Sequence, residues 1–134
     1  MEPAVKILIA GGTVAITVAL LLGFELGRRR QKQPAAEVHQ WLAAHEVVLM
    51  QGFMMFGLSL AASMSRLSRG LESTAAWLIV AAATSSFLGQ LSNAIQRIAD
   101  QFGQHSLGLR LNQLQSALLV PGVGILLYGV LRAL

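Results

Sequence analysis

Three side chains that could carry chemistry lie in the otherwise apolar segment AAHEVVLMQGFMMFG, residues 43–57. They are the imidazole of His45, the carboxyl group of Glu46 and the amide of Gln51. An imidazole can accept or donate a proton at neutral pH, and a nearby carboxylate can orient it. Ionisable and amide groups within apolar helices are costly, so they usually face the interior of a bundle and are paired or functional. We therefore expect His45, Glu46 and Gln51 to face the interior of a helix bundle if this segment enters a membrane.

Four apolar segments are long enough to hold such residues in a lipid bilayer. The chain has 134 residues, of which 54% are hydrophobic and 12% charged, whereas about a quarter of the residues in a typical soluble domain are charged. Four windows contain no Asp, Glu, Lys or Arg: residues 7–24, 47–65, 73–96 and 111–131. A helix that crosses the hydrocarbon core needs about 20 mostly apolar residues. The sequence predicts an all-α fold, a transmembrane four-helix bundle that forms a single membrane domain over residues 1–134, with helices at about 4–26, 40–66, 73–97 and 111–133.

Other classes of protein fit the composition less well. A soluble protein with four such helices in so short a chain would have too little polar surface. The first window differs from a secretory signal, because its basic cluster, residues 28–32, follows the apolar run instead of preceding it. The absence of cysteine excludes disulfides and thiolate chemistry. The basic residues lie in short loops without interleaved aromatic residues, so no nucleic-acid partner is expected.

The distribution of basic residues predicts the orientation in the membrane. The first and third loops hold six of them: Arg28, Arg29, Arg30, Lys32, Arg97 and Arg110. The opposite side holds four: Lys6, Arg66, Arg69 and Arg132. Cytoplasmic loops carry an excess of Lys and Arg. We therefore expect a multi-pass protein of the cytoplasmic (inner) membrane, with the first and third loops in the cytoplasm and both termini outside.

Further polar side chains are expected at the membrane depth of His45. The third helix carries Ser86, Gln90, Asn93 and Arg97, spaced four, three and four residues apart and therefore on one helical face. The fourth helix begins with Asn112, Gln113 and Gln115. Because consecutive helices alternate in direction, these residues and the early part of the second helix share one leaflet. The sequence predicts a polar pocket between three helices, near the cytoplasmic mouth of the bundle.

Two simpler interpretations remain open for these polar residues. Amides such as Gln51, Asn93 and Gln115 often serve only as hydrogen-bonding contacts between transmembrane helices. His45 and Glu46 lie near the beginning of an apolar window, where side chains can be solvated by the headgroup region. The meeting of all these residues at one depth is what favours a pocket.

Short motifs in three of the helices resemble those of the hydroxylaminobenzene mutase-like membrane proteins. In that family Ala-His is followed, six and seven positions after the histidine, by Asn-Gly; here Ala44, His45 and Gly52 match and Gln51 replaces the asparagine. The segment FLGQLSNA resembles an aromatic-Gly-x-x-x-Asn element through Gly89 and Asn93, and LLYGVL resembles the family's aromatic-Gly-Leu ending. Two positions differ, because the family's acid lies two residues after the histidine and its fourth helix carries a glutamate where this chain has Gln115.

The resemblance implies an isomerase without a cofactor, which rearranges an aryl hydroxylamine to an ortho-aminophenol. His45 would be the acid/base and Glu46 would orient it. The substrate-binding residues would be amides that hold the hydroxylamine and side chains that contact the ring: Gln51, Gln90, Asn93, Gln115, Met50 and Phe53. The substrate would be a small aromatic molecule that reaches the site from the lipid bilayer.

A different class of function is also compatible with the sequence. The thirteen glycines and the scarcity of catalytic groups suit a non-enzymatic small membrane subunit that packs in a larger membrane complex. The same small residues suit a homo-oligomer, and the sequence leaves both partners open. A transporter is less favoured, because its polar route would have to cross both leaflets. No metal site is expected, since His39 and His45 are six residues apart and point in different directions on one helix.

Overall fold

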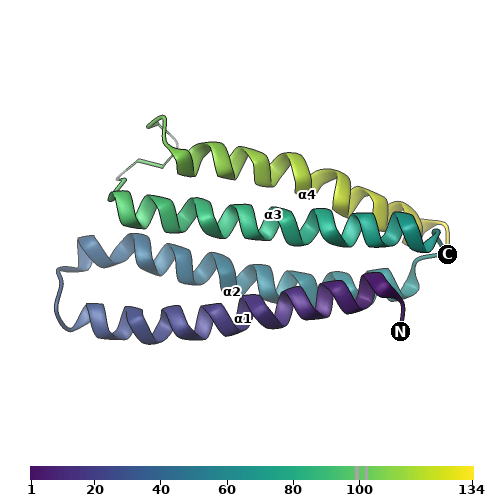
Figure 1. Cartoon of the computed structure of the whole chain (residues 1–134), viewed down its shortest axis with the longest axis horizontal. Helices are drawn as coiled ribbons and strands as arrows, with labels where there is room; N and C mark the ends of the chain where they lie inside the picture. Colours follow the sequence, from purple (N-terminus) through teal and green to yellow (C-terminus); the bar gives the residue numbers. More distant parts are fainter. Residues whose placement is uncertain (99, 102) are drawn as a thin grey trace.

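The computed structural model describes residues 1–98, 100–101 and 103–134, and only the backbone of residues 35–37. Within these residues the chain forms four α-helices and no strand: α1 (Pro3–Arg30), α2 (Ala35–Met64), α3 (Arg69–Gln96) and α4 (Leu107–Leu131). The helices lie side by side and alternate in direction, so that both termini lie at one end of the bundle (Figure 1). The predicted all-α four-helix bundle is confirmed.

All four helices are long and apolar enough to cross a membrane. They contain 28, 30, 28 and 25 residues, and at about 1.5 Å per residue the shortest is longer than the roughly 30 Å of a hydrocarbon core. Large apolar side chains cover the outside of the bundle, among them Phe24, Phe53, Trp77 and Val120, each more than 60% exposed. In water such a surface would drive aggregation, whereas lipid chains solvate it.

Serine side chains determine where α3 and α4 begin. The hydroxyl oxygen of Ser68 accepts a hydrogen bond from the backbone N–H of Leu71 at 3.5 Å, and that of Ser106 accepts from Leu109 at 3.1 Å. These N-caps satisfy backbone donors that the helices leave free. Both helices therefore begin four residues before their predicted starts, at 69 instead of 73 and at 107 instead of 111. The second helix begins directly after Pro34, which has no N–H to continue an earlier helix.

The helices pair into two hairpins, α1–α2 and α3–α4, through close backbone contacts at glycines. A Cβ on Gly12 would lie 3.0 Å from the backbone oxygen of Gly52, and a Cβ on Gly89 would lie 3.1 Å from that of Gly108. Only residues without side chains allow two transmembrane helices to approach so closely. The two hairpins are therefore the tightly packed units of the bundle.

Packing between the two hairpins is looser. Helix α3 lies against both α1 and α2, while α2 also touches α4; no contact joins α1 and α4 in the described part of the chain. The core between the hairpins is made largely of small side chains: Ala15, Ala19, Ala75, Ala76 and Ala83. Because alanine fills little volume, a groove remains between α1, α2 and α3 beside Ala15 and Ala83. A larger groove lies between α2, α3 and α4.

A charged cluster holds α1 to α2 at the end opposite the termini. The Glu25 carboxylate accepts hydrogen bonds from Arg28 Nε and Arg29 Nε, both at 2.8 Å. The guanidinium of Arg29 also stacks over the ring of Trp41, 4.1 Å from its centroid. An indole at this position suits the headgroup level of a membrane. The contact of Arg29 with Trp41 thus fixes the basic end of α1 against α2 at the level of the Trp41 ring.

Candidate functional site

The larger groove lies between α2, α3 and α4 and has a volume of about 700 Å³. This volume is within the usual range for a small-molecule site, about 300–1,000 Å³. Amide and hydroxyl side chains from three helices meet there with apolar ones, and we call it the amide groove. Its lining consists of Val47, Met50, Gln51, Met54, Ser86, Gln90, Leu109, Asn112, Gln113, Gln115 and Ser116.

Three residues that line the amide groove carry a buried amide oxygen without a hydrogen-bond partner among the described residues: Gln51, Gln90 and Asn112. Gln90 is only 8% exposed, and its Oε1 has no hydrogen-bond partner among the described residues. The same is true of Oε1 of the half-buried Gln51 on the facing helix. A buried acceptor without a partner costs about 1–3 kcal/mol. A ligand in the groove that donates N–H or O–H hydrogen bonds would remove this cost.

The structure brings four of the predicted substrate-binding residues together, namely Met50, Gln51, Gln90 and Gln115. The groove also contains three residues that the sequence predicted only at the membrane depth of the substrate-binding residues: Ser86, Asn112 and Gln113. The spacing could have identified two of these as lining residues. Ser86 is four residues before Gln90, and Asn112 is three residues before Gln115, so each pair shares a helical face.

Asn93 lies in the contact between α3 and α4 and does not line the amide groove. Its side chain is fully buried, and its Oδ1 accepts a hydrogen bond from Ser106 Oγ at 3.4 Å. The amide lies directly on Gly108, where any Cβ would collide with it. In this position Asn93 links the capping residue of α4 to α3.

His45 lies on the side of α2 that faces α1. Its Nδ1 donates a hydrogen bond to the backbone oxygen of Ala19 at 2.9 Å, and a Cβ on Gly23 would lie 3.1 Å from its Cε1. Because a carbonyl oxygen only accepts, Nδ1 carries the proton and Nε2 of the neutral ring is an acceptor. The histidine therefore does not line the amide groove together with Gln51 and Gln90.

Glu46 and Phe53 lie on the outer surface of α2. Both are exposed, and neither lines the amide groove. Glu46 is four residues before Met50, which does line the groove, so its carboxyl group lies about one helical turn from the rim. Among the described lining residues no side chain is ionisable. The groove itself can therefore bind a neutral molecule, and any proton transfer would need a group at its rim.

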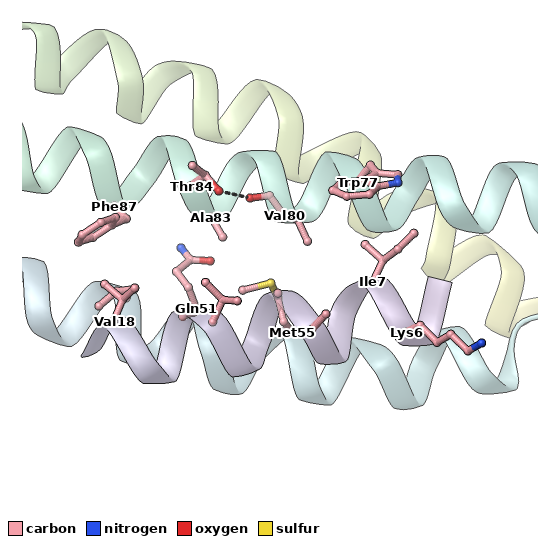
Figure 2. Close-up of a pocket in the computed structure, with 15 residues that line it drawn as sticks. Lys6, Ile7, Val18, Gln51, Met55, Trp77, Val80, Ala83, Thr84 and Phe87 are labelled. Atoms are coloured by element: carbon pink, nitrogen blue, oxygen red, sulfur yellow. Dashed lines mark hydrogen bonds between the residues drawn. The ribbon is translucent and has the colours of Figure 1, made fainter. Parts of the chain in front are cut away.

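A second groove, of about 520 Å³, lies between α1, α2 and α3 (Figure 2). We call it the apolar groove. It is lined by Lys6, Ile7, Ala10, Gly11, Val14, Ala15, Val18, Val48, Gln51, Met55, Trp77, Val80, Ala83, Thr84 and Phe87. Gln51 lines both grooves, since it lies on the part of α2 that faces α3.

No protein-family model, curated protein or solved structure matches this chain. Among the described residues, no three His, Asp or Glu side chains come together as metal ligands would.

Proposed function

We propose that this protein is a multi-pass protein of the cytoplasmic membrane whose amide groove binds a small, uncharged, largely apolar molecule with N–H or O–H donors. The buried and unpartnered Oε1 of Gln90 is the observation that supports this most directly. Gln51, whose Oε1 is also buried and unpartnered among the described residues, is a lining residue of the same groove. Asn112, whose Oδ1 is also buried without a partner among the described residues, is the third such lining residue, and three acceptors favour a ligand that donates more than one hydrogen bond.

The remaining lining residues support an uncharged ligand with an apolar body. Val47, Met50, Met54 and Leu109 supply apolar contacts on α2 and α4. A charged ligand would find no ionisable partner among the lining residues, and burying an unpaired charge is much more costly than burying a paired amide. Small aromatic amines, phenols and hydroxylamines have the required combination, and they partition into lipid.

An enzymatic form of this proposal is the rearrangement of an aryl hydroxylamine to an ortho-aminophenol. In that reaction the N–O bond breaks and a C–O bond forms at the ortho carbon. The ring carbon loses its proton and the nitrogen gains one, so no other reactant is consumed. In this form of the proposal one carboxyl group, that of Glu46 about a turn from the rim of the groove, would accept the proton of the ring carbon and return it to the nitrogen. His45 would have to act through Nε2, because Nδ1 is bonded to Ala19.

The experiment is incubation of membranes that contain the protein with hydroxylaminobenzene, followed by analysis for 2-aminophenol. We expect product to form, and expect Glu46→Gln to lower kcat by about 10²-fold or more, as for loss of a general acid–base group. Glu2→Gln is the matched control, because Glu2 precedes α1 at the end of the bundle that holds both termini, away from Glu46 (Figure 1). His45→Gln and its control His39→Gln test the histidine in the same assay.

Binding is measured separately from catalysis. Purified protein is titrated with hydroxylaminobenzene and with nitrobenzene, which has no donor hydrogen, and the thermal unfolding midpoint is recorded. Stabilisation by the first compound alone supports the binding proposal. If neither compound raises the unfolding midpoint, or if both raise it equally, the amide groove does not select molecules with donor hydrogens. If no 2-aminophenol forms above the level of membranes without the protein, the isomerase form of the proposal is wrong.

A further inference from the structure

The apolar groove runs along the bundle for about the depth of one lipid leaflet. In Figure 2 Lys6 marks one end, and Val18 and Phe87 mark the other. Lys6 and Val18 are twelve residues apart on α1, which corresponds to about 18 Å at 1.5 Å per residue. One leaflet contributes about half of the roughly 30 Å hydrocarbon core. The groove therefore has the length and direction of a single lipid chain.

Small side chains of α1 create this hollow, and its walls are apolar. Ala10 and Ala15 line the groove with single methyl groups, and Gly11 lets Met55 and Val80 pack directly against the backbone of α1. The hydroxyl group of Thr84 is not available to a ligand as a donor, because it donates to the backbone oxygen of Val80 at 2.9 Å (Figure 2). The amide of Gln51 lies at the deep end. Along most of its length the groove thus presents only hydrocarbon to an occupant.

A cation without an ion pair in the described part of the chain, Lys6, lies at one end of the groove. In Figure 2 the Lys6 side chain extends away from the apolar lining towards the end of the bundle. The nearest acidic residue in the sequence, Glu2, is engaged by Arg69 Nε at 3.2 Å. Among the described residues no ion pair involves Lys6 itself. A long ammonium side chain at a helix end reaches the headgroup region while its stem stays in the apolar layer.

We infer that the apolar groove holds one acyl chain of an anionic phospholipid, whose phosphate group pairs with Lys6. The hydrocarbon lining accommodates the chain, and the single cation selects the headgroup. The site lies in the leaflet that contains the two termini, on the opposite side of the α2–α3 contact from the amide groove.

The test is native mass spectrometry of the full chain, purified in detergent, freed of lipid, and titrated with phosphatidylglycerol or phosphatidylcholine. We expect one phosphatidylglycerol to bind with a preference of about five-fold over phosphatidylcholine, the contribution of one Lys near an anionic headgroup. Lys6→Gln should remove this preference. Lys32→Gln, at the other end of the bundle, should leave it unchanged.

Filling the groove tests the location of the acyl chain. Val14 lines the groove and is 63% exposed, so Val14→Phe fills it without entering the core. We expect at least ten-fold weaker binding of phosphatidylglycerol. Val120→Phe is the matched control, since Val120 is 72% exposed on α4 and should tolerate the same change. Ala10→Leu serves as the second filling variant if Val14→Phe does not fold.

Three outcomes would overturn the inference. The first is equal binding of phosphatidylglycerol by Val14→Phe and Val120→Phe. The second is a headgroup preference that survives in Lys6→Gln. The third is a dimer in the same spectra that Val14→Phe dissociates, because the groove would then hold a second copy of the chain. Gln90→Leu should leave lipid binding unchanged, so failure of this inference and failure of the amide-groove proposal are distinguishable.

Discussion

Gln90 and Asn93 show how two buried amides on one helix can have different roles. They are three residues apart on α3, so their side chains are rotated by about 60° from each other. That rotation directs Gln90 to the amide groove and Asn93 to the contact with α4. Asn93 accepts a hydrogen bond from Ser106 and lies outside the amide groove, although its Nδ2 has no partner among the described residues. Gln90 lines the groove, and its Oε1 has no partner in the described part of the chain. The first residue stabilises the fold, and the second is available to a ligand.

Substituting Gln90 should separate stability from binding. In Gln90→Leu the unpartnered oxygen disappears, so we expect the free energy of unfolding to rise by about 1 kcal/mol, near the lower limit of the cost of such a group. The stabilisation of the protein by hydroxylaminobenzene should be lost. Thermal unfolding in detergent, with and without the compound, measures both effects.

Gln113→Leu is the control for this substitution, because Gln113 is an exposed residue at the same groove and its replacement should not change stability. A destabilised Gln90→Leu variant would mean that the native glutamine has a partner and that no acceptor awaits a ligand. Asn93→Leu should lower the free energy of unfolding, whereas Gln90→Leu should raise it, because a leucine side chain at position 93 would have no space above Gly108.

At the scale of the helices, the glycine contacts explain why the bundle is made of two hairpins. Helices α3 and α4 meet at Gly89, Gly108 and Gly122, where a Cβ would lie about 3 Å or less from the facing helix. Other glycines, such as Gly57 and Gly124, have nothing within 4 Å of that position. The sequence alone does not distinguish glycines at a helix contact from glycines with open space around them, because both kinds lie in apolar helices. Their different roles depend on which way each helix faces.

Replacement by alanine should lower the free energy of unfolding at a glycine that contacts the facing helix and should not lower it at a glycine with open space around it. Gly108→Ala places a Cβ against the Asn93 amide, and we expect a loss of about 1–3 kcal/mol in the free energy of unfolding. Gly124→Ala on the same helix should be neutral or stabilise by about 0.5–1 kcal/mol, because alanine favours a helix interior. The two variants are compared by thermal unfolding in the same detergent. Equal effects of the two changes would contradict the α3–α4 contact.

At the scale of the whole molecule, the charges at the two ends of the bundle predict its orientation. The α1–α2 turn and the α3–α4 connection lie at one end, and the termini lie at the other (Figure 1). The first of these ends carries the larger number of basic residues, six compared with four. On the positive-inside rule we propose that it faces the cytoplasm.

The absence of cysteine makes this orientation directly measurable. Single cysteines introduced as Gln31→Cys and Ser63→Cys would lie near opposite ends of the bundle, and both positions are exposed. In intact cells a membrane-impermeant maleimide should label Ser63→Cys and should label Gln31→Cys only after the membrane is opened. The reverse pattern would place both termini in the cytoplasm and leave the fold unaffected.

The number of helices, their type and their approximate extents could be predicted from the sequence. Four uncharged windows of about 20 residues and the alternation of helix direction were sufficient, because a chain in lipid must satisfy its backbone hydrogen bonds within each segment. The common depth of Gln51, Gln90 and Gln115 followed from the same alternation. The helix starts at residues 69 and 107 differed from the prediction because the capping serines lie outside the apolar windows.

Only the tertiary structure decided which way each side chain faces. Membrane depth placed His45 in the predicted pocket with the amides, but the structure directs its ring to the backbone of α1. His45 and Gln51 are six residues apart, so their side chains are rotated by about 120° from each other around α2. The apolar groove was not anticipated, because it depends on small residues of α1 lying opposite α3. Depth in the membrane is a one-dimensional property that a sequence contains, whereas rotation of one helix against another is set by the close contacts between them.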